Sequence, residues 1–547
     1  MPHGSDGARP PRRHRFLLRL SAILLMVGAS AGVWVGFDGP TLGDRTLPGA
    51  VADPDAGRVD EAASRGGVRL SSACPGQKLE AVRELRAMWL TTVRNLDWPS
   101  KPGLPVEQVK AEYRAWMDLA VRMNHNAVFV HVRPSGDAFW PSKYAPWSHW
   151  LTGRMDGASP GWDPMEFMIA EAHARNLEFH AWFNPYKGSQ LPTLGELPDG
   201  HKLKRRQAWA VAYPKSGSGR RIYYNPGIPD ARKYVEDSIL EAVTNYDVDG
   251  VHFDDFFYPY PENGDDFNDD AAFAQYGKGM SKADWRRQNV NVFVKEMNER
   301  IKAAKPWVKF GISPFAIWRN KTSNPAGSAT DGLESYSAIY ADTRKWVKEG
   351  WLDYIVPQVY WHIGNAVANY SVLVPWWANL VKGTKVQLYI GQADYRVGEA
   401  GAWKDPAQLD KQLALNEKYG INGSIHFSAR HVRDDTLGAV SRYRKAHYAT
   451  PALIPPTAGA KDGPPGRPRD LTVRAEGNGT VVSWRPPDDA KPAWYAVYRT
   501  AAADQPARLV GTVRSTGDGE QRWTDPTPQS AHSYCVTALD RLWNESP

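Results

Sequence analysis

Two adjacent carboxylates, Asp254 and Asp255, are the residues of this sequence best suited to chemistry. They follow the apolar run from Val248 to Phe253 and precede an aromatic, proline-containing and acidic loop that begins at Phe256. Two carboxyl groups held close together in a partly apolar site acquire different pKa values, so one donates a proton while the other stays charged. The pair therefore predicts general acid and base chemistry. In the structural alternative, one aspartate caps the next element and the other is solvated.

Segments with strand-like and helix-like patterns alternate eight times between Glu84 and Tyr448. The predicted strands cover residues 86–93, 126–132, 177–183, 249–254, 308–313, 354–360, 386–391 and 423–427. Amphipathic runs follow them, predicted as helices at about residues 106–123, 164–176, 230–246, 282–304, 338–349, 367–382, 405–419 and 434–447. Eight such units predict a (β/α)8 TIM barrel, whose surplus over the usual ~250 residues lies in long loops after the strands. The alternative, a doubly wound open sheet, lacks its glycine-rich phosphate-binding motif.

Functional residues of a TIM barrel lie where the strands end, at the carboxyl face. Polar and aromatic side chains gather at these positions, whereas ordinary surface loops are rich in Gly, Ser, Lys and Glu. Asp137 and Asp394 are alternative catalytic carboxylates, and the sequence does not rank one above the other. The predicted substrate-binding residues are Asn95, Asp97, Trp98, His131, Arg133, Trp140, Trp182, Asn184, Tyr186, Tyr258, Trp318, Gln358, Tyr360, Trp361 and His426.

The roles of His131, of His426 and of one basic segment have alternatives that the sequence leaves open. His131 and His426 fit equally well as buried residues of the barrel interior that are satisfied by hydrogen bonds. The basic segment of residues 201–221 is predicted to be a solvated loop, with the lining of a groove for a polyanionic glycan as the alternative.

Composition narrows the substrate class. The chain contains 23 Trp and 24 Tyr, and the flat C–H faces of sugar rings pack on aromatic faces, so a carbohydrate groove is favoured. The net charge of +7 suits an anionic polymer, but it is too diffuse to indicate nucleic acid binding, and no nucleic-acid motif is present. The two cysteines, Cys74 and Cys535, are too few for a disulfide framework or a cysteine-based metal site. We expect no metal and no other cofactor.

The two ends of the chain predict export and a second domain. Residues 1–37 combine a basic segment with an apolar run, which indicates a signal peptide or an uncleaved membrane anchor, and residues 38–83 read as a flexible linker. The protein is thus expected to be secreted, or held at the outer face of the cytoplasmic membrane or in the cell wall, and to be a monomer. After the barrel, residues 84–448, a Pro/Gly-rich linker covers residues 449–466, and alternating short strands predict a small all-β sandwich at residues 467–547.

Six blocks of sequence, in order, resemble one family of bacterial envelope proteins. They include RELRAMWLTTVRNLDWPS, LEFHAWFNPY, DGVHFDDFFYPYP and DYIVPQVYWHIG, and together they are similar to the glycosyl-hydrolase-like family 10 barrels. The resemblance implies a TIM barrel, a glycosidase activity and a cell-wall glycan substrate, most specifically peptidoglycan glycan strands freed of peptide. The segment after the barrel is similar to a fibronectin type III module, with Trp484 at its core, and its last strand is expected to be missing.

For sugars that carry 2-acetamido groups, the resemblance suggests a substrate-assisted mechanism. One aspartate of the pair polarises the acetamido group while the other protonates the leaving oxygen, which requires the strand to end before Asp255 so that both face one cleft. The alternative within catalysis opposes one of the pair with Asp137 or Asp394. A different class of function also stays open, in which the barrel binds glycan without cleaving it and acts as a wall-tethered scaffold.

Overall fold

The computed structural model describes residues 78–547, apart from residues 216, 218, 460–462, 478, 490, 502–504 and 528–531. The predicted signal or anchor segment at residues 1–37 and most of the predicted linker lie outside the described residues. Among the helices that are described, none has both the length and the apolar character needed to cross a bilayer.

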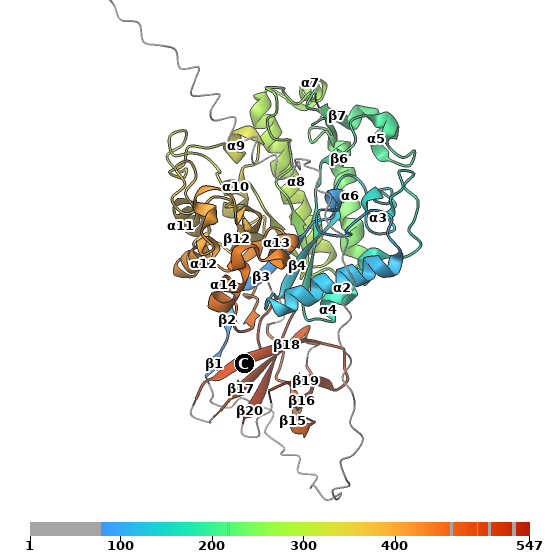
Figure 1. The fold of residues 1–547 in the computed structure, drawn as a ribbon. Helices are drawn as coiled ribbons and strands as arrows, with labels where there is room; N and C mark the ends of the chain where they lie inside the picture. Colours follow the sequence, from blue (N-terminus) through green and yellow to red (C-terminus); the bar gives the residue numbers. More distant parts are fainter. Residues whose placement is uncertain are drawn as a thin grey trace, which may run out of the picture. The chain divides into compact units, whose positions relative to one another are not determined.

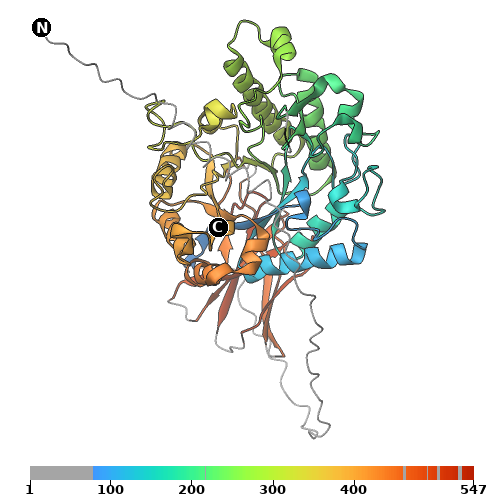
Figure 2. The same cartoon turned by 45° about the horizontal axis from the view of Figure 1, so that its top comes forward.

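Eight parallel strands close into a barrel, as the sequence predicts. In chain order they are β3 (Leu85–Leu90), β4 (Ala127–Arg133), β5 (Glu178–Phe183), β9 (Gly250–Phe253), β10 (Lys309–Ile312), β11 (Tyr354–Ile355), β12 (Gln387–Gln392) and β13 (Gly423–His426). Each pairs with the next, and β13 pairs with β3 to complete the circle. The fold is therefore a (β/α)8 barrel, with its helices around the outside (Figures 1 and 2).

The main helices follow the predicted pattern. They are α2 (Val106–Arg122), α4 (Pro164–His173), α6 (Pro229–Asn245), α8 (Lys282–Ala304), α10 (Thr343–Lys348), α11 (Tyr370–Val381), α12 (Gln408–Lys418) and α14 (Ala439–His447). A capping side chain marks the start of four of them, α4, α8, α10 and α11. Ser281 and Asp163 accept backbone N–H groups at the first turns of α8 and α4. The predicted helix at 434–447 is interrupted, since Asp435 and Leu437 adopt positive φ angles between α13 (Ala429–Asp434) and α14.

A small antiparallel sheet stands on the carboxyl end of the barrel, in the long loop between β5 and α6. It pairs β8 (Arg221–Tyr224) with β6 (Lys187–Ser189) on one side and β7 (Ala210–Tyr213) on the other. Figure 1 shows β6 and β7 at the end of the barrel away from β17 (Trp494–Thr500) and β20 (Ser533–Leu539). The segment 201–221, predicted to be a solvated loop, contains α5 (Lys202–Arg205) and β7 and buries His201 and Leu203, while Arg205, Arg206, Lys215 and Arg220 are exposed.

The interior of the barrel is polar as well as aromatic. Gly250 and Gly311 make room for it, since a Cβ on either residue would clash with the rings of His180 and Tyr354. A chain of hydrogen bonds runs along the interior through buried side chains. It passes from Trp543 to Glu178 (2.6 Å), His180 (3.0 Å), Tyr354 (3.1 Å), His252 (3.3 Å) and Ser313 (3.1 Å).

The C-terminal region forms two antiparallel β-sheets packed around one core. One sheet pairs β15 (Arg469–Glu476), β16 (Gly479–Arg485) and β19 (Gln521–Asp525), and the other contains β17, β18 (Ala507–Arg514) and β20. Trp484 is fully buried between them with Tyr534, Val536 and Ala538, as the predicted sandwich requires. An antiparallel bridge from Leu539 to Glu545 continues the pairing beyond β20. The fibronectin type III assignment, with its missing strand, stays a prediction.

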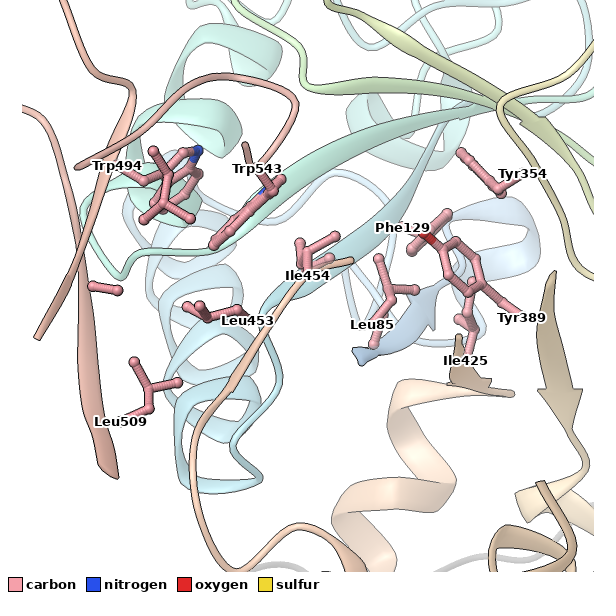
Figure 3. Close-up of a cluster of buried hydrophobic side chains, with 14 of the residues drawn as sticks. Leu85, Phe129, Tyr354, Tyr389, Ile425, Leu453, Ile454, Trp494, Leu509 and Trp543 are labelled. Atoms are coloured by element: carbon pink, nitrogen blue, oxygen red, sulfur yellow. The ribbon is translucent and has the colours of Figure 1, made fainter. Parts of the chain in front are cut away.

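Segments predicted as linkers pack against the amino end of the barrel. Residues 79–83, at the end of the first predicted linker, form β1 (Leu79–Glu80), which pairs with β18, and β2 (Val82–Arg83), which pairs with β14 (Ala452–Leu453) in the second. Leu453 and Ile454 are buried between barrel residues such as Leu85 and Phe129 and the side chains of Trp494, Leu509 and Trp543 (Figure 3). Apolar burial thus turns part of both linkers into a layer between barrel and sandwich.

Buried ion pairs complete this amino end. Lys309 contacts both oxygens of Glu178, at 2.7 and 2.8 Å, and all three charged atoms lie in fully buried side chains. Asp249 accepts hydrogen bonds from His173 (2.8 Å), from the backbone of Phe179 (2.8 Å) and from Arg514 of β18 (3.1 Å). Each buried carboxylate therefore has the partners that an interior charge requires.

The β-sandwich also contains a disulfide-bonded cysteine. Cys535 in β20 is buried and disulfide-bonded. The other cysteine of the sequence, Cys74, lies outside the described residues.

Candidate active site

Asp254 and Asp255 lie at the carboxyl end of β9, the fourth barrel strand, which ends at Phe253. Both are buried, with exposed fractions of 9% and 4%. The regular strand has already ended at Asp254, and the backbone N–H of Asp255 turns back to Oδ1 of Asp254 at 2.9 Å. Consecutive residues of a continuing strand would point to opposite faces. The early end of β9 therefore allows both carboxyl groups to occupy one site.

The surroundings of the two carboxyl groups raise the pKa of both, and more strongly that of Asp255. Burial is the main cause, and the neighbouring Asp254 carboxylate adds to it for Asp255. Lys187 and the hydrogen bonds from the Asp255 backbone and Gln358 counteract the shift at Asp254. Since two close carboxylates do not both ionise readily, and since the pKa of Asp255 is raised more strongly, Asp255 is the carboxyl group of the pair that keeps its proton to higher pH.

Lys187 of β6 is the main cation facing the pair, and the sequence analysis missed it. Its Nζ lies 3.4 Å from the centre of the Phe256 ring, and Asp254 and Asp255 both act on its charge. Burial, partly offset by the two aspartates, lowers the pKa of Lys187 to about 8. No sequence pattern indicates this position, because a three-residue strand pairing with β8 places it there.

Hydroxyl and amide groups from other loops bind the pair directly. The Tyr260 hydroxyl donates to Oδ2 of Asp255. Gln358 Nε2 lies 2.8 Å from the carbonyl oxygen of Ser313 and 3.3 Å from Oδ1 of Asp254, so β10 and β11 both contribute to the site. Tyr360 is close enough for both aspartates to raise its pKa, after the larger effect of burial. Of the predicted binding residues, Gln358 and Tyr360 thus lie at the pair.

An aromatic run borders the site. The ring of Phe256 contacts that of Tyr260 (5.7 Å between centroids), which contacts Phe315 (6.1 Å), and Phe315 packs on Trp361 (5.5 Å). Such faces can stack against sugar rings. Two other aromatic residues of the loop that begins at Phe256 pack elsewhere. Phe257 packs on Phe293 and Trp346, and Tyr258, a predicted binding residue, packs on Phe267 and Tyr340.

Several buried polar groups at the carboxyl ends of β4 and β5 have atoms with no hydrogen-bond partner among the described residues. The His131 ring stacks on Trp182 at 3.9 Å, and neither its two nitrogens nor the Trp182 indole N–H is hydrogen-bonded there. Burial, and then Lys187, lowers the pKa of His131 well below its usual value, so the ring is neutral. Arg133 Nε and Nη2 and Asn184 Oδ1 are likewise unpartnered. Unsatisfied groups of this kind are costly unless a ligand or water meets them.

The alternative carboxylates lie elsewhere. Asp394 accepts hydrogen bonds from His426 Nδ1 (2.9 Å) and Tyr443 (3.3 Å), and His426 also contacts the Tyr448 hydroxyl. Asp137 accepts the Ser135 N–H at 2.9 Å, lines a separate pocket with His149 and Gln190, and leaves its Oδ2 unpartnered. Neither aspartate is among the main causes of the pKa shifts of Asp254 and Asp255, although Asp394 acts with that pair on the pKa of Tyr360.

The other predicted binding residues hold the loops or the helices in place. Asn95 donates to the carbonyls of Pro99 and Trp150, and Asp97 joins the first loop to the eighth by accepting from Ser428 (2.7 Å). The indole N–H of Trp98 donates to the Val109 carbonyl, that of Trp140 to Glu241 and that of Trp318 to Asp342. Tyr186 packs on Phe293. Their predicted contact with substrate is neither supported nor contradicted by these bonds.

Among the described residues, no group of three or more His, Cys, Asp or Glu side chains is arranged to hold a metal ion. The chemistry that the site offers is proton transfer by two buried carboxyl groups, of which Asp255 keeps its proton to higher pH than Asp254, beside aromatic rings and the Lys187 ammonium.

The chain resembles known proteins over most of its length. It matches the family described as Glycosyl hydrolase-like 10 at residues 84–410. It is 45% identical over 477 residues to the glycosyl hydrolase YngK of Bacillus subtilis, covering 85% of this chain and 92% of that protein. It is 39% identical over 394 residues to the glycosyl hydrolase DigH of Escherichia coli, covering 68% of this chain and 88% of that protein.

Among solved structures, the glycoside hydrolase domain of PgaB (BpsB) from Bordetella bronchiseptica aligns with 67% of this chain and 98% of its own, at 13% identity and a TM-score of 0.45. The family match and the two relatives, rather than this distant structural similarity, establish the relationship. This chain is a member of the glycosyl hydrolase-like 10 family.

Proposed function

We propose that this protein is an exported glycoside hydrolase that cleaves cell-wall polysaccharide, most specifically the glycan strands of peptidoglycan, with Asp254 and Asp255 as its catalytic pair. The observation that carries the proposal is the state of that pair. Two buried carboxyl groups share one site at the carboxyl end of the fourth strand, and the pKa of Asp255 is raised well above its usual value by burial and by Asp254. A carboxyl group that stays protonated near neutral pH is what protonation of a glycosidic oxygen requires.

The mechanism follows from the two environments. Asp255 donates its proton to the leaving oxygen as the glycosidic bond breaks. Burial raises the pKa of Asp254 as well, but Lys187, the Asp255 N–H and Gln358 favour its charged form, so Asp254 is the member of the pair that ionises first. In a sugar with a 2-acetamido group, Asp254 accepts the acetamido N–H, and the acetamido carbonyl oxygen attacks the anomeric carbon. Water then opens the resulting ring, returning its proton to Asp255.

Export is supported by two features of different kinds. The sequence begins with a basic and then apolar segment of the signal or anchor type. In addition, Cys535 is disulfide-bonded, and disulfides persist mainly in oxidising compartments outside the cytoplasm. A cell-wall substrate is accessible only on that side of the membrane.

The test uses the full chain and purified peptidoglycan glycan strands, with products analysed by mass. We expect shorter oligosaccharides from the wild type and none from Asp255→Asn, while both proteins bind the strands. A wild type that binds strands and leaves them intact would favour the scaffold function instead. Cleavage that survives in Asp255→Asn would move the catalysis to other carboxylates.

A further inference from the structure

The hydrogen-bond chain through the barrel interior has a fixed group at each end. At one end the Trp89 indole N–H, which can only donate, lies 3.2 Å from His252 Nε2, so this nitrogen accepts. At the other end Lys309 contacts both oxygens of the Glu178 carboxylate. This carboxylate accepts the proton of His180 Nε2 at 3.0 Å. Each end thus fixes which ring nitrogen of one histidine carries the proton.

The Tyr354 hydroxyl joins the two histidines and gives the chain one direction. It lies 3.1 Å from His180 Nδ1 and 3.3 Å from His252 Nδ1. Burial lowers the pKa of His252 well below its usual value, so its ring is neutral and its single proton is on Nδ1. His252 Nδ1 therefore donates to the Tyr354 oxygen, and the Tyr354 hydroxyl donates to His180 Nδ1. Reversing the chain would set the N–H groups of Trp89 and His252 against each other.

Ser313 connects this chain to the aspartate pair. Its hydroxyl lies 3.1 Å from His252 Nε2 and 3.3 Å from the Phe253 carbonyl, which also accepts the Ser313 backbone N–H at 2.9 Å. Phe253 is the last residue of β9 and directly precedes Asp254. The Ser313 carbonyl accepts Gln358 Nε2 at 2.8 Å, and the same nitrogen lies 3.3 Å from Asp254 Oδ1. Both amide hydrogens of Gln358 are thus used, which fixes how this amide faces Asp254.

We propose that Ser313 and Gln358 are positioning residues of the reaction, which hold the Asp254 carboxylate in place from a hydrogen-bond chain anchored at Glu178. This inference rests on the proposed function for the role of Asp254 and adds the residues that orient it. A catalytic group is held most precisely when the side chains that contact it are themselves fixed by further hydrogen bonds. Ser313 meets this condition, because it is bonded to both β9 and the interior chain.

The test measures cleavage of glycan strands against pH, with the full chain. Ser313→Ala removes the hydroxyl and keeps the carbonyl, and Gln358→Leu removes the amide. Since Gln358 favours the charged form of Asp254, its loss should raise the pKa of Asp254 and move the acid limb of kcat/KM upward by up to about one pH unit. Ser313→Ala should move that limb in the same direction by less, with kcat lowered several-fold and KM nearly unchanged. Combining the two changes should give no further shift, because Ser313 acts through Gln358.

A second measurement does not depend on cleavage. Titration of the Asp254 carboxyl group, followed by NMR with isotope-labelled aspartate and assigned with Asp254→Asn, should show the same upward shifts in the two variants. The titratable groups that face Asp254, namely Asp255, Lys187, Tyr260 and Tyr360, are unchanged in both. A wild type that leaves the strands intact while Asp254 titrates as expected in the variants would refute the proposed hydrolysis and leave the positioning role standing.

Ser424→Ala is the matched control. Ser424 is also buried in a barrel strand, β13, but its hydroxyl accepts from Asn416 at 3.2 Å and has no bond to the interior chain. This control should leave the acid limb and the Asp254 titration unchanged. Equal shifts in Ser313→Ala and Ser424→Ala, an unmoved Asp254 titration in Gln358→Leu, or additive shifts in the double variant would overturn the inference. Imidazole nitrogen shifts that place the His252 proton on Nε2 would overturn the direction of the chain.

Discussion

Two aspartates flank the same four-residue strand, and they behave in opposite ways. Asp249 precedes β9 at the amino end of the barrel, and Asp254 follows it at the carboxyl end. Both are buried. Burial alone would raise the pKa of each, but at Asp249 Arg514 and His173 outweigh it and hold the pKa far below its usual value, whereas at Asp254 it stays raised. The charge of Asp249 is therefore met by partners within the protein, whereas that of Asp254 is left available.

The same contrast extends across the two ends of the barrel. At the amino end, Glu178 is met by Lys309, His180 and Trp543. At the carboxyl end, ring and side-chain atoms of His131 and Trp182 have no partner within the described residues. Partnered buried polar groups stabilise a fold, and unpartnered ones lower its stability unless a ligand completes them. Unpartnered groups also lie at the amino end, including both ring nitrogens of His125, so the contrast between the two ends rests on how their buried carboxylates are partnered.

The largest effect is expected from a change at the aspartate pair, at the carboxyl end of the barrel. Asp255→Asn removes the proton donor, so turnover of glycan strands should fall by about 10³-fold, the scale of general acid catalysis. Folding should not suffer. Because the folded-state pKa of Asp255 is raised, ionisation in the unfolded chain costs the wild type stability as pH rises above ~3.9. The variant should therefore melt at or above the wild-type temperature at pH 7, and a lower melting temperature would contradict the assigned charge state.

The mirror-image change is Asp249→Asn at the amino end. It breaks a buried charge network, and the free energy of unfolding in urea should fall by about 3 kcal/mol. Activity per folded molecule should be retained. Since the folded-state pKa of Asp249 is held far below the ordinary value of ~3.9, its contribution is complete above that value and is lost gradually as pH falls towards the folded-state pKa. The difference between wild type and variant should be smaller in strong acid than at neutral pH, and a difference that grows as pH falls would count against the ion pairs.

A smaller change tests the partner of Glu178. Trp543→Phe keeps an aromatic ring and removes the indole N–H that Glu178 Oε1 accepts at 2.6 Å. Glu178 retains Lys309 and His180, so the loss of unfolding free energy should be about 1–2 kcal/mol, measured by urea denaturation. Trp484→Phe is a useful comparison, because the Trp484 N–H has no partner among the described residues. Equal losses in the two variants would show that packing, and not the hydrogen bond, matters at Trp543.

The smallest effect is a shift in pH dependence. Cleavage should decline on the alkaline side as Asp255 loses its proton. The hydrogen bond from Tyr260 lowers the pKa of Asp255, although burial and Asp254 raise it more. Tyr260→Phe should therefore move the alkaline limb of kcat/KM upward by up to about one pH unit. A shift to lower pH would mean that Tyr260 stabilises the protonated acid instead.

The helices and strands of the barrel could be predicted because the residues that specify each of them are close together in the sequence. The α8 helix begins after Ser281 and ends at Ala304, as expected, since a capping serine and an unbroken amphipathic run specify both ends. Asp254 and Asp255 were found in the same way, as a polar pair at the end of an apolar run. What could not be predicted depends on pairing between distant segments. Lys187 faces the pair only because β6 pairs with β8, and Trp543 meets Glu178 across 365 positions of sequence.

That last contact bears on how much of the chain the barrel needs in order to be complete. The family match stops at residue 410, yet the barrel is closed by β13 and its amino end is covered by Leu453, Ile454 and Trp543. A fragment limited to residues 84–410 would therefore lack the eighth strand and would remove the Trp543 contact from the buried Glu178–Lys309 pair. The part of the chain that the family model recognises is thus shorter than the part that completes the barrel, and the β-sandwich serves as the floor of the barrel rather than as a separable accessory.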